Sequence, residues 1–297
     1  LPVATKGRGS LLLWTILCIL LPPIYKTMSA SFPLWEPHEL PIDASILWQC
    51  GPVRIYFRRR DQDWLIASHV SSDRSIEAKV ELCEDFPPNI QWSRWALNQD
   101  ATKFKIRPCM PDRPIVVRPS TQLALPPGSQ VQFFVSIPLW LDVGVYVQNK
   151  YVFSSTPIPS AILSSTWFGD VLEGELCYAL RTFAYRNVDH FDLLPNRVLC
   201  PLTITNQSPD FLEFDKICLE VKYLGIYKGE ERLWANAVRI RNLHKDQIGN
   251  VTYERSTPLM AKKGELLAPS QKVPAQSLAS RVFGLSALNP FQIFDNP

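Results

Sequence analysis

The chain lacks the short motifs that mark the common catalytic sites. It has no Walker loop, no dinucleotide-binding glycine pattern, no HExxH pair and no Gly-x-Ser-x-Gly elbow. Its four histidines, His38, His69, His190 and His244, are scattered and belong to no motif. Nucleophilic catalysis needs a cysteine or serine beside a histidine with an orienting acid. The sequence therefore predicts a non-enzymatic protein without a cofactor.

An excess of charge of one sign is missing from the body of the chain. The formal net charge of +3 comes from Lys6, Arg8 and Lys26, and beyond residue 27 the 28 basic residues balance the 28 acidic ones. Nucleic acids are disfavoured as partners, because neutralising phosphates needs a net basic face. The one dense basic run, Arg58-Arg59-Arg60, precedes two acids and is interpreted as a solvated hairpin end.

Glycine is scarce, with 12 residues against 26 prolines, and the prolines recur between short apolar runs. This pattern suits many short strands joined by turns and argues against long helices. Period-two alternation supports it. In residues 76–82 four apolar side chains alternate with three charged ones, and residues 103–107 show the same alternation of charged and apolar side chains. We expect an all-β, mainly antiparallel fold with two β-sandwich, immunoglobulin-like domains.

The domain boundaries follow from composition. Residues 30–113 are predicted to form an amino-terminal β domain and residues 114–250 a carboxyl-terminal β-sandwich, divided at the prolines between Pro108 and Pro114. An ordered crossover inside one larger β domain is the alternative. The tail, residues 251–297, is expected to hold an amphipathic helix over residues 275–288, since apolar residues fall at helical intervals there. Such a helix would pack on its own sandwich or contact a partner or a membrane surface.

Residues 1–27 form a separate leader. The apolar run Leu11–Leu21 is eleven residues long, too short for the roughly 20 helical residues that span a bilayer. It has signal-peptide dimensions, with Ser29-Ala30-Ser31 as a cleavage region. The favoured interpretation is translated upstream sequence before Met28. Cellular location follows from this choice. The protein is expected to be cytoplasmic, with peripheral membrane association, or exported if the leader is a real signal.

The six cysteines beyond the leader are widely spaced and form no CxxC pair, which favours reduced thiols.

The most unusual stretch is Ser164–Thr182, which combines three aromatics, two glycines, three carboxylates and a thiol. We interpret residues 169–174 as a turn. The flanking Trp167, Phe168, Leu176 and Tyr178 are expected to anchor the strands in the core, and the acids are expected to pair with bases such as Arg181. Cys177 lies in an apolar context that blunts reactivity.

The three carboxylates of this stretch are weak candidates for binding a metal. Asp170, Glu173 and Glu175 offer oxygen ligands of the kind that calcium and magnesium prefer. No ligand loop of recognised spacing accompanies them, so no metal site is expected. Upstream, Asp112 and Arg113 lie between Pro111 and Pro114, which holds a charged pair in a stiff segment. This pair is either a structural ion pair at a domain junction or a binding site.

Several blocks of the sequence resemble one known family. They are Met110–Pro119, Ser136–Trp140, Leu163–Asp170, Gly174–Ala179, and Tyr227 with Leu233-Trp234. Together they closely resemble the bacterial and archaeal family called domain of unknown function 432. The resemblance brings no catalytic residues. It implies a gene neighbourhood with small-conductance mechanosensitive channels, and hence an accessory that binds such a channel.

The leading hypothesis is therefore a non-enzymatic protein-interaction module of unspecified oligomeric state, with a mechanosensitive channel as partner. The contact is expected to use the Trp167-to-Glu175 turn and the terminal helix. One alternative is an exported, envelope-associated carbohydrate-binding module, which would need exposed tryptophans. Another is a hydrolase using the three acids. The candidate interaction residues are Asp112, Arg113, Trp167, Phe168, Gly169, Asp170, Glu173 and Glu175.

Overall fold

The computed structural model describes residues 34–72, 75–97, 101–154, 156–243, 248–262, 264–273 and 278–284. Within these residues strands dominate, and the helical elements are three 3-10 turns: η1 (Val188–His190), η2 (Val221–Tyr223) and η3 (Leu259–Ala261). Most strand pairs of the described chain are antiparallel, and three are parallel. The prediction of an all-β, mainly antiparallel fold is confirmed at this level. The expected leader, residues 1–27, lies outside the described residues.

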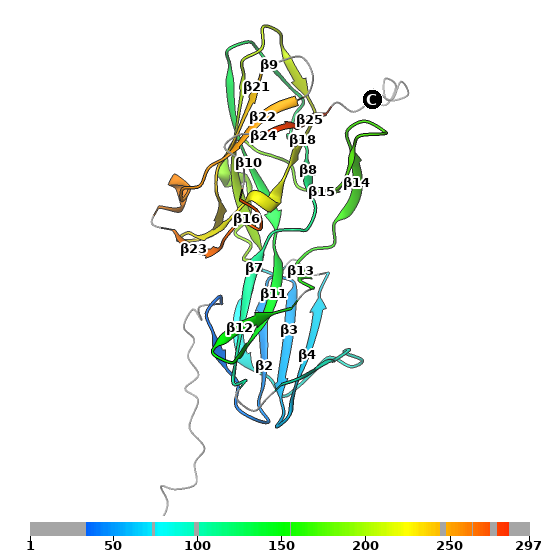
Figure 1. Cartoon of the computed structure of the whole chain (residues 1–297), viewed down its shortest axis with the longest axis vertical. Helices are drawn as coiled ribbons and strands as arrows, with labels where there is room; N and C mark the ends of the chain where they lie inside the picture. The colour runs from blue at the N-terminus through cyan, green and yellow to red at the C-terminus, as the bar shows by residue number, and fades with distance from the viewer. Residues whose placement is uncertain are drawn as a thin grey trace, which may run out of the picture. The chain divides into compact units, whose positions relative to one another are not determined.

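Two antiparallel sheets are built mainly from the first half of the described chain (Figure 1). The β2 sheet has the order β5-β2-β3-β4-β6, with strands β2 (Ser45–Cys50), β3 (Val53–Arg59), β4 (Asp63–Val70), β5 (Ala78–Leu82) and β6 (Ser93–Ala96). The β11 sheet has the order β1-β7-β11-β12 with β13 also on β11, from strands β1 (His38–Glu39), β7 (Lys103–Cys109), β11 (Trp140–Val147), β12 (Lys150–Phe153) and β13 (Ile158–Pro159). Since β7 and β11 pair, one sheet takes strands from both sides of residue 113. The boundary between two domains at residue 113 stays a prediction.

Aromatic side chains fill the space between these two sheets. Phe57 of β3 stacks on Phe104 of β7 with ring centroids 4.0 Å apart, and both rings are fully buried. Trp64 of β4 meets both rings edge-on, and its indole N–H donates to the carbonyl of Ala101. The polar end of a buried indole thus has a partner while its apolar body packs.

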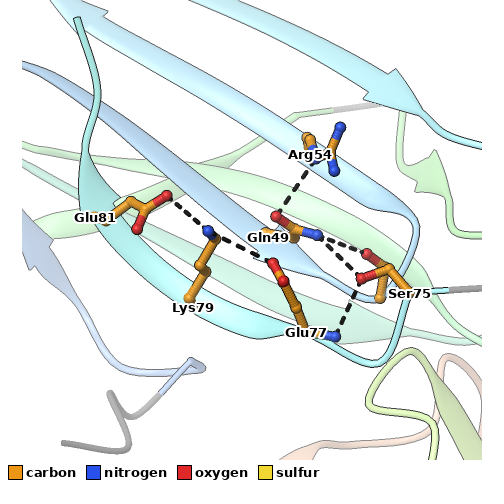
Figure 2. A network of polar contacts seen from close by, with 7 residues as sticks. Gln49, Arg54, Ser75, Glu77, Lys79 and Glu81 are labelled. Atoms are coloured by element: carbon orange, nitrogen blue, oxygen red, sulfur yellow. Dashed lines mark hydrogen bonds and ion pairs between the residues drawn. The ribbon is translucent and has the colours of Figure 1, made fainter. Parts of the chain in front are cut away.

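A polar network links β2 and β3 to the segment that leads into the edge strand β5 (Figure 2). The buried amide of Gln49 donates to the Ser75 hydroxyl at 3.3 Å and accepts from Arg54 at 3.4 Å. Lys79 lies between Glu77 and Glu81, at 3.5 and 2.9 Å. The exposed ion pairs contribute little to stability, whereas the satisfied amide removes the cost of a buried polar group.

The alternation of residues 76–82 only partly describes their burial. Val80 is buried, but Ile76 and Leu82 are 69% and 54% exposed. The expected apolar face is therefore covered only at its centre. Strand β5 lies at the edge of its sheet with β2 as its one neighbour, and Ile76 precedes its first residue.

The second half of the described chain is centred on one long strand. The β16 sheet has the order β23-β19-β20-β16-β21-β22-β24 with β10 also on β16, from strands β10 (Gln130–Pro138), β16 (Arg197–Asn206), β19 (Ile226–Lys228), β20 (Leu233–Ala235), β21 (Val238–Asn242), β22 (Ile248–Tyr253), β23 (Glu265–Ala268) and β24 (Leu278–Arg281). Nine residue pairs join β10 and β16.

A smaller sheet carries the segment that the sequence singled out. The β8 sheet has the order β14-β15-β8-β18-β25, from strands β8 (Ile115–Val117), β14 (Ser164–Phe168), β15 (Glu175–Ala179), β18 (Lys216–Leu219) and β25 (Phe283–Gly284). A separate pair joins β9 (Leu123–Leu125) to β17 (Leu212–Phe214).

The predicted carboxyl-terminal helix is wrong over residues 278–284, the part of it that the structure describes. Leu278–Arg281 pairs with β22, and Phe283–Gly284 pairs with β18. Val282 and Phe283 are both buried, although they are adjacent in sequence. Two open strand edges offer this segment more hydrogen bonds and burial than a helix interrupted by Gly284. The remaining residues of the predicted helix lie outside the described residues.

Replacing Phe104 with alanine tests the aromatic core. Removing a buried ring stacked on Phe57 is expected to lower the free energy of unfolding by about 3–5 kcal/mol. Urea denaturation followed by fluorescence measures it. Phe183→Ala is the control, because that ring is 44% exposed and its loss is expected to cost under about 1 kcal/mol. Equal losses in the two variants would contradict the assignment.

Candidate functional site

Strands β14 and β15 form an antiparallel hairpin at the edge of the β8 sheet (Figure 1). Phe168 pairs with Glu175 and Trp167 pairs with Leu176. Side chains alternate across a strand and directly paired residues share a face. The hairpin therefore has an inner face with Phe168, Glu175 and Cys177, and an outer face with Trp167, Leu176 and Tyr178.

Two glycines and one aspartate shape the turn of the hairpin. Gly169 adopts φ +108°, and a Cβ on it would lie 2.9 Å from the Cα of Gly174. A Cβ on Gly174 would lie 2.4 Å from Nε1 of Trp167. Two hydrogen bonds also hold the turn: the Trp167 indole N–H donates to the Asp170 carbonyl at 2.9 Å, and the Asp170 carboxylate accepts from the backbone amide of Leu172. The turn therefore needs both glycines, and Asp170 has a structural role in it.

The outer face and the turn expose apolar side chains. Val171 and Leu172 are 85% and 90% exposed, and Trp167 and Leu176 are 52% and 45% exposed. The expectation that Trp167 and Leu176 anchor the strands in the core is wrong, while Phe168 is buried as expected. Phe168 and Cys177 of the inner face pack in a buried cluster, so Trp167 and Leu176, which alternate with them, face water. Apolar side chains grouped on a projecting element are typical of contact surfaces.

Asp112 and Arg113 approach the outer face of the hairpin. The Arg113 guanidinium carbon lies 5.3 Å from the centroid of the Tyr178 ring, within cation–π range. Burial, together with a hydrogen bond to the Asp112 carboxylate, raises the pKa of the Tyr178 phenol. Trp140 meets the same ring at 5.9 Å. The fold thus brings the segment Met110–Pro119 into contact with the stretch Ser164–Thr182 at Tyr178.

The inner face packs against β8 and β18. Phe168 and Cys177 form a buried cluster with Val116 and Cys218. The Sγ atoms of Cys177 and Cys218 are 3.8 Å apart, and a Glu175 oxygen lies within 4.8 Å of both. Burial and the nearby Glu220 raise the pKa of Glu175. The pKa of the Cys218 thiol is raised by its contact with Cys177 and by burial.

Sequence reasoning missed this grouping, because Cys218 is 41 positions from Cys177. Of the three acids proposed as metal ligands, Glu175 alone belongs to the one such group found among the described residues. Asp170 and Glu173 are exposed. None of the three forms an ion pair with Arg181 in the part of the chain that the structure describes, and no described histidine joins the group around Cys177.

A half-buried arginine, Arg197, holds the chain just after the hairpin. Arg197 of β16 donates to the carbonyl and hydroxyl of Ser136, each at 2.7 Å, and to the hydroxyl of Thr182 at 3.3 Å. Burial lowers its pKa to about 10. These bonds tie the segment that follows β15 to β10 and β16, which limits where the hairpin can lie.

None of the helices in the described ranges is long and apolar enough to cross a membrane. The fold and site together define an all-β protein whose edge hairpin presents an aromatic and aliphatic outer face. The chain belongs to the protein family of unknown function DUF432, whose model matches residues 34–287. This confirms the resemblance found from the sequence. Searches of the curated proteins and of the solved structures each returned no match.

Gly174→Ala tests the turn. The added Cβ collides with the Trp167 indole and with the Asp170 carbonyl, 2.5 Å away, so the hydrogen bond between them is expected to break. The indole N–H resonance of Trp167 should shift in a ¹H–¹⁵N spectrum. Gly128→Ala is the control, because it adds a Cβ to another turn glycine, one with positive φ, where the new atom meets nothing within 4 Å. An unmoved Trp167 resonance in Gly174→Ala would refute this account of the turn.

Proposed function

We propose that the protein binds another protein through the outer face and turn of the β14–β15 hairpin. The observation that carries this proposal is the grouping of Trp167, Val171, Leu172 and Leu176, all exposed, on one edge element. Aromatic residues in particular are enriched in protein interfaces. The Asp112 and Arg113 pair supplies charged groups beside this surface. The hairpin alone is assigned this role, since the described part of the expected terminal helix is strand.

The hairpin also offers a free strand edge. Strand β14 pairs only with β15 among the described strands, so the backbone groups on its other side face outward. Adding a partner strand to such an edge is a recurrent mode of protein recognition, in which backbone bonds give affinity and alternate side chains give specificity. Trp167 would supply the side-chain contact in this mode.

The partner to test first is a small-conductance mechanosensitive channel, as the family resemblance implies. In this proposal the protein is a cytoplasmic, non-enzymatic accessory that reaches the membrane by binding the channel. A saccharide-binding surface receives less support. Of the described tryptophans, Trp167 alone is in the exposed range, and Trp35, Trp48, Trp64 and Trp234 are buried.

We also propose that the two halves are immunoglobulin-like sandwiches. The Phe57–Phe104 stack supports this for the β2 and β11 sheets, because it joins two antiparallel sheets face to face. An experimental structure in which these sheets close into a single barrel would contradict it.

Capture from gently solubilised native membranes tests the partner. Carboxyl-tagged protein is expected to recover the channel in near-stoichiometric amount, identified by mass spectrometry. Recovery of the bait alone, in the soluble fraction, would remove the channel from the proposal.

Val171→Ser with Leu172→Ser tests the surface. Each buried aliphatic side chain contributes about 1.5–3 kcal/mol, so the double variant should bind the purified channel at least about tenfold more weakly. Leu259→Ser is the matched control, since Leu259 is 96% exposed on η3. Binding by the double variant as tight as that of the control would show that the hairpin is not the contact.

A further inference from the structure

The inner face of the hairpin holds a group of metal-ligating atoms that is independent of the outer face. Cys177 is fully buried and Cys218 is 5% exposed, and they come from β15 and β18. Glu175, half-buried, lies two residues before Cys177 and so shares its face of the strand. The ligand atoms of all three lie within 4.8 Å of one another.

The spacing of the two sulfurs matches a tetrahedral metal site. Two thiolates at 2.3 Å from a zinc ion with tetrahedral angles lie about 3.8 Å apart. The observed Sγ–Sγ separation is 3.8 Å. A disulfide would need the sulfurs at about 2.05 Å, so the two cysteines are unbridged and both sulfurs are open to a ligand role. A zinc-bound sulfur and carboxylate oxygen lie about 3.6 Å apart, and a half-buried glutamate side chain can make that adjustment.

We propose that Cys177, Cys218 and Glu175 bind one zinc ion. Thiolates select zinc over magnesium and calcium, and zinc also accepts carboxylate oxygens. Glu220, two residues after Cys218, is near enough to affect both Glu175 and Cys218 electrostatically. Lys222, at 2.7 Å from Glu220, offsets the negative charge of the ligand set.

The bound ion would join β15 to β18 across the short strand β8. It would hold the inner face of the hairpin to the sheet, and so act as a structural clamp. Because a ligand that binds only the folded state stabilises it, zinc should also raise the melting temperature. This inference does not rest on the protein-binding proposal, and its test involves no partner protein.

Metal binding by the reduced, metal-free full chain tests the proposal. Zinc is titrated against a competing chelator, and cobalt(II) serves as a spectroscopic probe of thiolate ligation. Wild-type protein is expected to bind one zinc per chain. Cys177→Ser and Cys218→Ser are each expected to bind at least about tenfold more weakly, as is Glu175→Gln, since losing even an outer-shell partner of a metal costs 10–100-fold. Cys200→Ser is the control, because Cys200 is equally buried but belongs to no such group.

X-ray absorption on the zinc-loaded wild type gives an answer that does not depend on any variant folding. Two sulfur scatterers at about 2.3 Å with lighter atoms at about 2.0 Å would support the site. A shell without sulfur, or zinc binding that is unchanged in the double variant Cys177→Ser with Cys218→Ser, would overturn it. So would a native Cys177–Cys218 disulfide in a protein that takes up no zinc once reduced.

Discussion

The pairing of β15 with β8 is the constraint on which the candidate site depends. Strand β8 is three residues long and buried throughout, and it lies between β15 and β18. The amide of Tyr178 donates to the carbonyl of Pro114 and that of Leu180 to Val116, at 2.8 and 2.9 Å. These bonds fix the register of β15 on β8. They also place Cys177 beside Cys218 and bring Tyr178 next to Arg113.

The two faces of the hairpin differ in burial: one attaches the hairpin to the sheet and the other is exposed to water. The inner face buries Phe168 against Val116 and the two cysteines, which gives the hairpin its attachment. The outer face leaves Trp167 and Leu176 in water, which costs hydrophobic free energy that a partner can recover by covering them. Because the inner face is packed against the sheet, the outer face is held in a defined position, and the hairpin loses less conformational entropy when a partner binds it.

Much of the fold could be predicted from local pattern. The alternation at residues 103–107 falls within β7 (Lys103–Cys109), in which Phe104 and Ile106 are buried and the charged residues that alternate with them are half-buried. The helix expected over 275–288 fails because a local pattern carries no information about distant hydrogen-bond partners. Its described part finds strand edges whose existence no local pattern reveals.

The sequence by itself determined the strand-rich class, the family, the turn at residues 169–174 and the importance of the segments around Asp112 and Trp167. Alternation, glycine and proline placement and motif identity are local properties, and they can be read along one chain. Only the tertiary structure decided which hairpin face is covered, that Arg113 meets Tyr178, and that Glu175 and Cys177 lie beside Cys218. Those contacts join residues 41 to 65 positions apart, and their proximity depends on strand order in the β8 sheet, which local patterns do not encode.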